Sequence, residues 1–157
     1  MKNSPRFPLI FWRVISRFNR RLVSGYGPKS KTSKRVLVLT TVGRKSGQPR
    51  STPLQFEEVD GVYYVASARG RKADWFRNLI VNPQVEVRVK DQCFQTCAEL
   101  ISEPGKIADF LELRLKRHPG FMGIMLRLEG LPHKYSRTDL EKFARRLAIV
   151  VLDPKIP

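Results

Sequence analysis

This sequence has little sulfur and little histidine, which limits the chemistry it can support. Only two cysteines and two histidines occur among 157 residues. Two cysteines are too few for a disulfide framework, and on one strand Cys93 and Cys97 would lie roughly 13 Å apart, too far to bridge without a bend. No histidine accompanies them at the spacing of zinc ligands. We therefore expect no metal site and two small buried or half-buried thiols in a reducing cytosol.

Acidic residues are missing from the first third of the chain. All 14 Asp and Glu residues follow Phe56, whereas 13 of the 30 Lys and Arg residues precede it. This asymmetry indicates an anionic partner near the N-terminal region: a polyanionic coenzyme, an anionic membrane or nucleic acid. The aromatic residues are not interleaved with basic ones in a known nucleic-acid-binding pattern, so a specific nucleic-acid partner ranks last.

The sequence also lacks an apolar run that could span a bilayer, which takes about 20 residues. Phe7–Ser24 has instead the pattern of a basic amphipathic helix, with four apolar residues on one face and four arginines opposite. Two interpretations stay open: the helix packs on the folded domain, which is slightly favoured, or it lies on the inner face of an anionic cell membrane. A Gly, Pro, Ser and Lys linker follows, so we expect a helix and linker over residues 1–33 and a cytoplasmic cofactor-binding domain over 34–157.

Beyond the linker, short apolar stretches with alternating polarity predict mainly antiparallel strands with two or three helices between them. The expected strands are Arg35–Val42, Thr52–Val59, Val62–Ala68, Val85–Val89, Cys93–Ile101 and Leu147–Leu152, and the expected helices are Lys72–Ile80, Pro104–Lys116 and Phe121–Leu128. Asp60–Gly61 is a strong signal for a two-residue hairpin turn. Val85–Val89 alternates as a half-exposed strand would, and the two isolated histidines, His118 and His133, are expected on surface loops. This pattern predicts an α+β fold built on a small barrel rather than a doubly wound sheet.

The most informative segment is RVLVLTTVGRKSGQPR, residues 35–50. A strand enters a turn that contains two glycines and three cations, Arg44, Lys45 and Arg50, before a second strand beginning Ser51-Thr52-Pro53. Glycines permit a tight reversal, and free amides in such a turn can face a bound anion. Two interpretations are about even on these residues alone: a seat for a phosphate-bearing cofactor, or a solvated basic hairpin turn.

A resemblance favours the first interpretation. The runs LTTVGRKSGQPRSTPL and VYYVASARGRKADWFRNLIVNPQVEVRV resemble the deazaflavin-dependent nitroreductase family, whose members are split β-barrel proteins that bind coenzyme F420. The similarity is close and in register over Val36–Val89 and returns weakly over Tyr135–Asp153. The resemblance thus implies a split barrel and a deazaflavin cofactor.

The resemblance also implies which residues hold the cofactor. The basic turn would bind the phosphate of the cofactor, and the strand after the turn would line the cofactor ring. Small residues at the end of the next strand would let the ring approach closely. The helix that follows would close over the cofactor. The residues that match are Arg44, Lys45, Ser46, Arg50, Ser51, Thr52, Pro53, Leu54, Gln55, Ala66, Ser67, Ala68, Arg69, Ala73, Asp74, Trp75 and Phe76. For Trp75 a role as a core anchor is an equal alternative.

The implied chemistry is hydride transfer from reduced F420 to a quinone, enone or nitro compound. Tyr135 and Ser67 are the candidates to donate a proton or to stabilise negative charge on the acceptor. The C-terminal third departs from the family's usual run of tyrosines, which leaves the acceptor open. Three alternatives remain: an FMN-dependent oxidoreductase, a non-enzymatic cofactor or haem-binding protein on the same fold, and a nucleic-acid binder. The oligomeric state is open, with a homodimer as one option.

Overall fold

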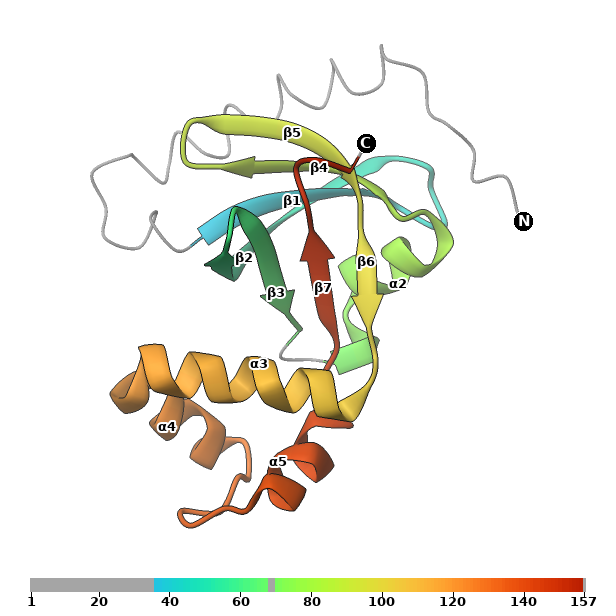
Figure 1. Cartoon of the computed structure of the whole chain (residues 1–157). Helices are drawn as coiled ribbons and strands as arrows, with labels where there is room; N and C mark the ends of the chain where they lie inside the picture. Colours follow the sequence, from blue (N-terminus) through green and yellow to red (C-terminus); the bar gives the residue numbers. More distant parts are fainter. Residues whose placement is uncertain (1–35, 68–69, 157) are drawn as a thin grey trace.

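The computed structural model describes residues 36–67 and 70–156, and these form one curled antiparallel sheet with helices at one end and one side (Figure 1). The N-terminal helix and linker expected over residues 1–33 lie outside the described residues. The strands are β1 (Val36–Val42), β2 (Pro49–Val59), β3 (Val62–Ala66), β4 (Gln84–Val89), β5 (Gln92–Cys97), β6 (Glu99–Ile101) and β7 (Ile149–Leu152). The helices are a 3₁₀ turn η2 (Gly70–Lys72), α2 (Asp74–Val81), α3 (Pro104–Arg117), α4 (Pro119–Leu128) and α5 (Arg137–Ala144).

The sheet has the order β5-β4-β1-β2-β3-β7-β6, and every pairing is antiparallel. Its two edge strands, β5 and β6, are separated in sequence only by Ala98. The amide of Ala98 donates to the carbonyl of Pro83, and the Thr96 hydroxyl donates to the carbonyl of Asp153, at 2.8 and 2.6 Å. One continuous stretch of chain therefore borders both edges, which requires the sheet to curl into the expected barrel.

The barrel is split along β2. Pro49–Gln55 pairs with β1, whereas Phe56–Val59 pairs with β3. Among the described residues, the other edge of Pro49–Gln55 pairs with no strand. An unpaired edge presents main-chain donors and acceptors to whatever lies beside it. The split thus leaves an open edge directly after the basic turn.

Two apolar clusters hold the fold together. The first lies inside the barrel and against α2, and the second lies between the barrel and α3, α4 and α5. Their most deeply buried large side chains include Leu37, Leu39, Val65, Leu79, Val85, Val87 and Val89 in the first and Ile107, Leu140 and Ile149 in the second. Strand β7 supplies residues to both clusters, so it connects the packing of the barrel to the packing of the helical layer.

Most expected elements are confirmed, with boundary shifts of a few residues. The Asp60–Gly61 turn is confirmed, since both residues have positive φ, 52° and 80°. The expected long strand over Cys93–Ile101 is wrong: it divides into β5 and β6 because the chain must pass from β4 to β7 around the barrel. The expectation of two or three helices also falls short, because α5 was missed.

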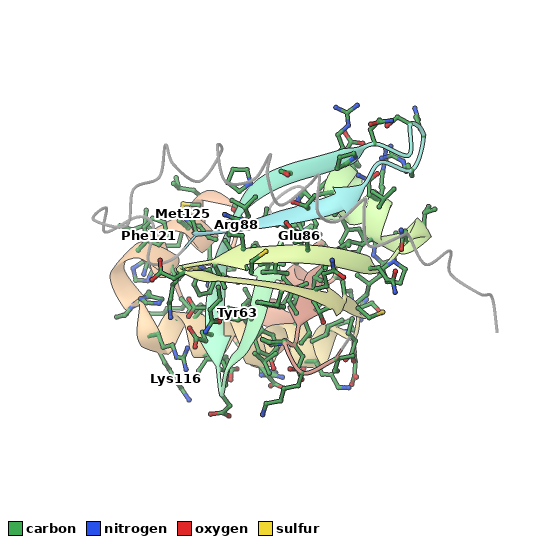
Figure 2. The ribbon with its side chains drawn as sticks, turned by 90° about the horizontal axis from the view of Figure 1, so that it is seen from above. Tyr63, Glu86, Arg88, Lys116, Phe121 and Met125 are labelled. Atoms are coloured by element: carbon green, nitrogen blue, oxygen red, sulfur yellow. The ribbon has the colours of Figure 1, made fainter. Side chains whose placement is uncertain are left out.

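Three local expectations are wrong for reasons of packing. Glu86, labelled in Figure 2, is only 2% exposed, although it lies on the strand face expected to be open, and its neighbours across the sheet are Thr40 of β1 and Gln95 of β5. Cys93 is exposed because β5 is an edge strand, although both cysteines are free as expected. His118 is not isolated, since its Nε2 lies 3.2 Å from Oε1 of the buried Glu57.

Candidate functional site

The basic turn between β1 and β2 is closed by its own main chain. The Gly43 amide donates to the Gln48 carbonyl and the Gly47 amide donates to the Gly43 carbonyl, both at 2.8 Å. Gly47 has φ +66°, and a Cβ on Gly43 would lie 2.9 Å from the Ser46 hydroxyl oxygen. Glycine therefore suits Gly47 because of its backbone angle, and it suits Gly43 because of the limited space beside the Ser46 side chain and the Gln48 carbonyl.

A buried amide fastens this turn to α2. The main-chain amide and Nη1 of Arg44 both donate to Oδ1 of Asn78 at 3.1 Å, and Nδ2 of Asn78 donates to the Thr41 hydroxyl at 3.1 Å. Nη2 of Arg44 forms an ion pair with Asp74 at 2.9 Å. Asn78 is only 3% exposed, so its bonds are shielded from water. The turn is thereby held in one orientation relative to the helix.

This network separates the three cations into two kinds. The guanidinium of Arg44 is occupied by Asn78 and Asp74, which makes Arg44 an anchor of the turn. Lys45 and Arg50 are exposed, and their side chains form no hydrogen bond or ion pair within the described ranges. The main-chain amides of Lys45 and Ser46 likewise donate to no described residue. Two cationic side chains and two amides on one exposed turn are a donor set that fits a phosphate.

The residues after the turn lie along the open edge of β2. Arg50, Pro53 and Gln55 are exposed, and Ser51, Thr52 and Leu54 are half-buried. The Ser51 hydroxyl lies 2.9 Å from the Thr40 hydroxyl of β1. The expected ring-lining residues of β2 thus all lie on the segment Pro49–Gln55, whose second edge pairs with no described strand.

The end of β3 returns toward the same helix. The Ser67 hydroxyl donates to the Gly70 carbonyl at 2.8 Å, the Gly70 amide donates back to the Ser67 carbonyl at 2.9 Å, and Ser67 is 2% exposed. Gly70 has φ +55°, and a Cβ there would collide with the Arg146 carbonyl. The hydroxyl proton of Ser67 therefore forms a hydrogen bond that closes a tight turn. In this structure Ser67 positions the chain between β3 and α2. Ala68 and Arg69 lie outside the described residues.

Trp75 and Phe76 lie in the barrel core. They are 8% and 5% exposed, and their rings pack edge to face with centroids 5.9 Å apart. Ala73 is also buried, whereas Asp74 faces solvent and pairs with Arg44. Of the expected helix residues, only Asp74 therefore lies on the surface beside the basic turn.

Tyr135 lies apart from these residues. It is 42% exposed in the loop between α4 and α5, where it lines a small pocket of about 170 Å³ with Leu115, Arg127 and Leu131 among its neighbours. Figure 1 shows this loop at the opposite end of the molecule from the β1–β2 turn. The fold of one chain does not bring the two candidates for proton donation, Tyr135 and Ser67, together.

Sequence reasoning missed Asn78 and a second polar cluster. Asn78 has a sequence signal, because a lone amide sits among the apolar residues of the helix in WFRNL. The second cluster surrounds Glu57, which pairs with Arg114, Arg117 and His118 at 3.2, 3.4 and 3.2 Å. No spacing in the sequence reveals it, because Glu57 and Arg114 are 57 residues apart. Among the described residues no group of His, Cys, Asp and Glu is arranged to hold a metal ion.

The comparisons with solved structures agree with the fold described above. Solved structures with the same fold include the conserved protein Rv2991 of Mycobacterium tuberculosis, with TM-score 0.55 and 15% identity over 99% of this chain and 85% of that one. They also include an F420H2-dependent reductase, FDR-A, with TM-score 0.51 and 20% identity over 76% of this chain and 95% of that one. At such identities the likeness establishes the fold alone.

The family follows from the sequence match. The model of the F420H2-dependent quinone reductase family matches residues 11–124, so the chain belongs to that family, and the family implies coenzyme F420. The F420H2-dependent quinone reductase Rv1261c of Mycobacterium tuberculosis is 35% identical over 66 residues. That match covers 40% of this chain and 44% of the relative, so the aligned part spans less than half of the curated protein. The resemblance drawn from the turn and helix motifs is confirmed.

Proposed function

We propose that this protein transfers a hydride from reduced coenzyme F420 to a small organic acceptor, with a quinone as the preferred class. The observation that carries the proposal is the basic turn within the matched family region, where Lys45 and Arg50 present unpaired cations and α2 holds the turn in place. Enones and nitro compounds are further acceptors within the same chemistry.

The bound coenzyme would supply the hydride, so the protein has to bind the coenzyme, orient it toward the acceptor and shield both from water. Lys45, Ser46 and Arg50 would hold the phosphate, with Arg50 able to donate two parallel hydrogen bonds. The open edge of β2 from Ser51 to Gln55 would offer main-chain groups to the flat ring. Ser67 fixes the turn at the end of β3, and the neighbouring Ala66 is half-buried and packs against the second core cluster. Because positioning accounts for a large part of such catalysis, no acid–base pair is required at the turn.

Tyr135 remains a candidate proton donor for the acceptor. Since one chain places Tyr135 away from the basic turn, its participation would require a second copy of the chain or a rearranged loop. A Tyr135→Phe variant tests the role: a lower kcat with unchanged F420 affinity would support it, and unchanged kcat would exclude it. A homodimer is therefore part of this proposal.

Contact of Phe7–Ser24 with an anionic membrane is a separate prediction, which deletion of residues 1–24 would test.

The first experiment titrates the purified chain with F420 and, in parallel, with FMN, and follows tryptophan fluorescence. Tight binding of F420 alone would support the proposal and justify assays with quinones as acceptors. Preference for FMN would keep the fold and assign the chemistry to a flavin, whereas binding of neither would contradict the enzyme proposal.

The turn itself is tested by charge reversal. We expect Lys45→Glu and Arg50→Glu each to weaken F420 binding by at least tenfold, since one charge-assisted hydrogen bond contributes about 1.5–3 kcal/mol. Both side chains are exposed, so the unfolding temperature should not change. Lys142→Glu on α5 is the matched control and should bind F420 as the natural chain does. Equal affinity in all four proteins would refute the phosphate-binding role of the turn.

A further inference from the structure

Helix α4 carries two apolar faces, and within residues 36–67 and 70–156 only one of them packs into a core cluster. Met122 and Leu126 are 4% and 3% exposed and pack with α3 and α5 in the second core cluster. Four other large apolar residues of this helix face outward. They are Phe121, Ile124, Met125 and Leu128, with exposed fractions of 52%, 59%, 38% and 80%.

These four residues form a single stripe. Their spacing of i, i+3, i+4 and i+7 places them within roughly 100° on one side of the helix. Figure 1 shows α4 beside α3, with α3 between α4 and most of the sheet. Phe121, at one end of the stripe, lines a small pocket with Gln55 and Phe56 of β2 and is still 52% exposed. Large exposed apolar patches on otherwise polar surfaces mark sites that another surface covers.

The charges around the stripe indicate which kind of surface covers it. Lys116, Arg127 and Lys134 are exposed and form no ion pair with described residues, and between Lys116 and Lys134 the only acidic residue is Glu129. In Figure 2 Phe121 and Met125 lie close together, and Lys116 lies at the same end of the molecule but on its other side. The chain segment that carries the stripe therefore has an excess of unpaired positive charge.

We propose that the outer face of α4 docks on an anionic lipid bilayer. The four apolar side chains would enter the boundary between headgroups and acyl chains, and the flanking cations would meet lipid phosphates. A second copy of the chain fits this face less well than a bilayer does. A symmetric contact through the outer face of α4 would bring the same cations of the two copies against one another. The described residues contain no helix long and apolar enough to cross a membrane, so the contact lies at the surface. This inference does not depend on the proposed enzymatic function.

The experiment measures co-sedimentation of the full-length chain with vesicles of phosphatidylcholine alone and with vesicles that also contain phosphatidylglycerol. We expect binding to the anionic vesicles that weakens as salt rises. The variant Ile124→Ser/Leu128→Ser should reduce the partition coefficient at least tenfold. The matched control is Ile80→Ser/Val81→Ser on α2, where two apolar residues are 59% and 61% exposed, and it should bind as the natural chain does.

Three outcomes would overturn the proposal. The full-length chain could fail to sediment with anionic vesicles, or both double variants could bind equally, which would assign any contact to another part of the chain. Alternatively, light scattering could show a dimer that Ile124→Ser/Leu128→Ser dissociates while vesicle binding persists, which would identify a second copy as the occupant. Circular dichroism of each variant confirms that the fold is intact, since all four substituted side chains are at least half exposed.

Discussion

At the scale of single residues, the site depends on one buried amide. Asn78 accepts two hydrogen bonds from Arg44 and donates one to Thr41, which joins the basic turn, β1 and α2. An amide can do this because it carries both an acceptor oxygen and a donor nitrogen. Lys45 and Arg50 remain available to a ligand because Arg44 and Asn78 hold the turn without them.

We predict that Asn78→Ala lowers the free energy of unfolding by about 1–3 kcal/mol, because it leaves the Thr41 hydroxyl and the Arg44 amide without this partner. The same substitution should weaken F420 binding, since the turn loses its fixed orientation. Urea unfolding and fluorescence titration measure the two effects. Arg77→Ala, at an exposed position one residue earlier, should change stability by less than about 0.5 kcal/mol. Natural affinity in a destabilised Asn78→Ala protein would show that the anchor serves stability alone.

At the scale of elements, the first turn of α5 fixes where this helix begins and how it packs on α3. Ser136 and Asp139 form a capping box: the Asp139 amide donates to the Ser136 hydroxyl, and the Ser136 amide donates to the Asp139 carboxylate at 2.9 Å. Arg137 then forms ion pairs with Asp109 and Glu112 of α3, at 2.7 and 2.9 Å. These contacts fix where the chain enters the helix that supports β7.

We predict that Ser136→Ala destabilises the protein by about 1 kcal/mol through loss of this cap. The cap also has a pH dependence. Hydrogen bonds from the Ser136 amide and hydroxyl lower the pKa of the Asp139 carboxyl. The ionised Asp139 carboxylate therefore stabilises the folded protein fully at pH values above its unfolded pKa of about 3.9. This stabilisation is lost as the pH falls through the lower pKa of the folded state.

The measurement is urea unfolding at several pH values between 3 and 7, on the natural chain and on Ser136→Ala. The difference in stability between the two proteins should shrink toward acid pH. A difference that stays constant across the range would contradict the coupling to Asp139. Direct titration of the Asp139 carboxyl by NMR supplies an independent check of the direction of its pKa.

At the scale of the whole molecule, a buried charge cluster joins the barrel to the helical layer. The side chain of Glu57 on β2 is 8% exposed and meets Arg114, Arg117 and His118 at the end of α3. Arg117 also donates to the main-chain carbonyl of Glu58 at 2.9 Å. The cluster therefore fixes α3 on β2 at the point where β2 leaves β1 and joins β3.

We predict that Glu57→Ala lowers the free energy of unfolding by about 3 kcal/mol, because it leaves Arg114 and its neighbours without their buried counter-charge. Glu58→Ala is the matched control on the adjacent residue. Glu58 pairs with Lys90 at 3.0 Å on the surface, so its loss should cost at most about 1 kcal/mol. Equal destabilisation by the two substitutions in urea unfolding would show that burial of the cluster contributes nothing.

The local features of this protein could be predicted from its sequence. The Asp60–Gly61 turn and the Pro104 helix start both follow from interactions within a few residues, and both are present. The strand expected around Val85 is present too, although the half-exposed pattern expected for it is not. The glycines and cations of the basic turn are equally local, because Gly43 and Gly47 act on their own turn. The family resemblance rested on these local motifs and is confirmed.

Tertiary structure alone decided which of the expected site residues are available to a ligand. Arg44 and Lys45 are adjacent cations in the sequence, but only the placement of α2 binds one and leaves the other exposed. Trp75 became a core residue, and Tyr135 came to lie at the far end of the molecule, because packing between distant segments sets burial. The outward stripe of α4 is of the same kind. Its periodicity is visible in the sequence, but only the fold shows which of its two apolar faces stays uncovered.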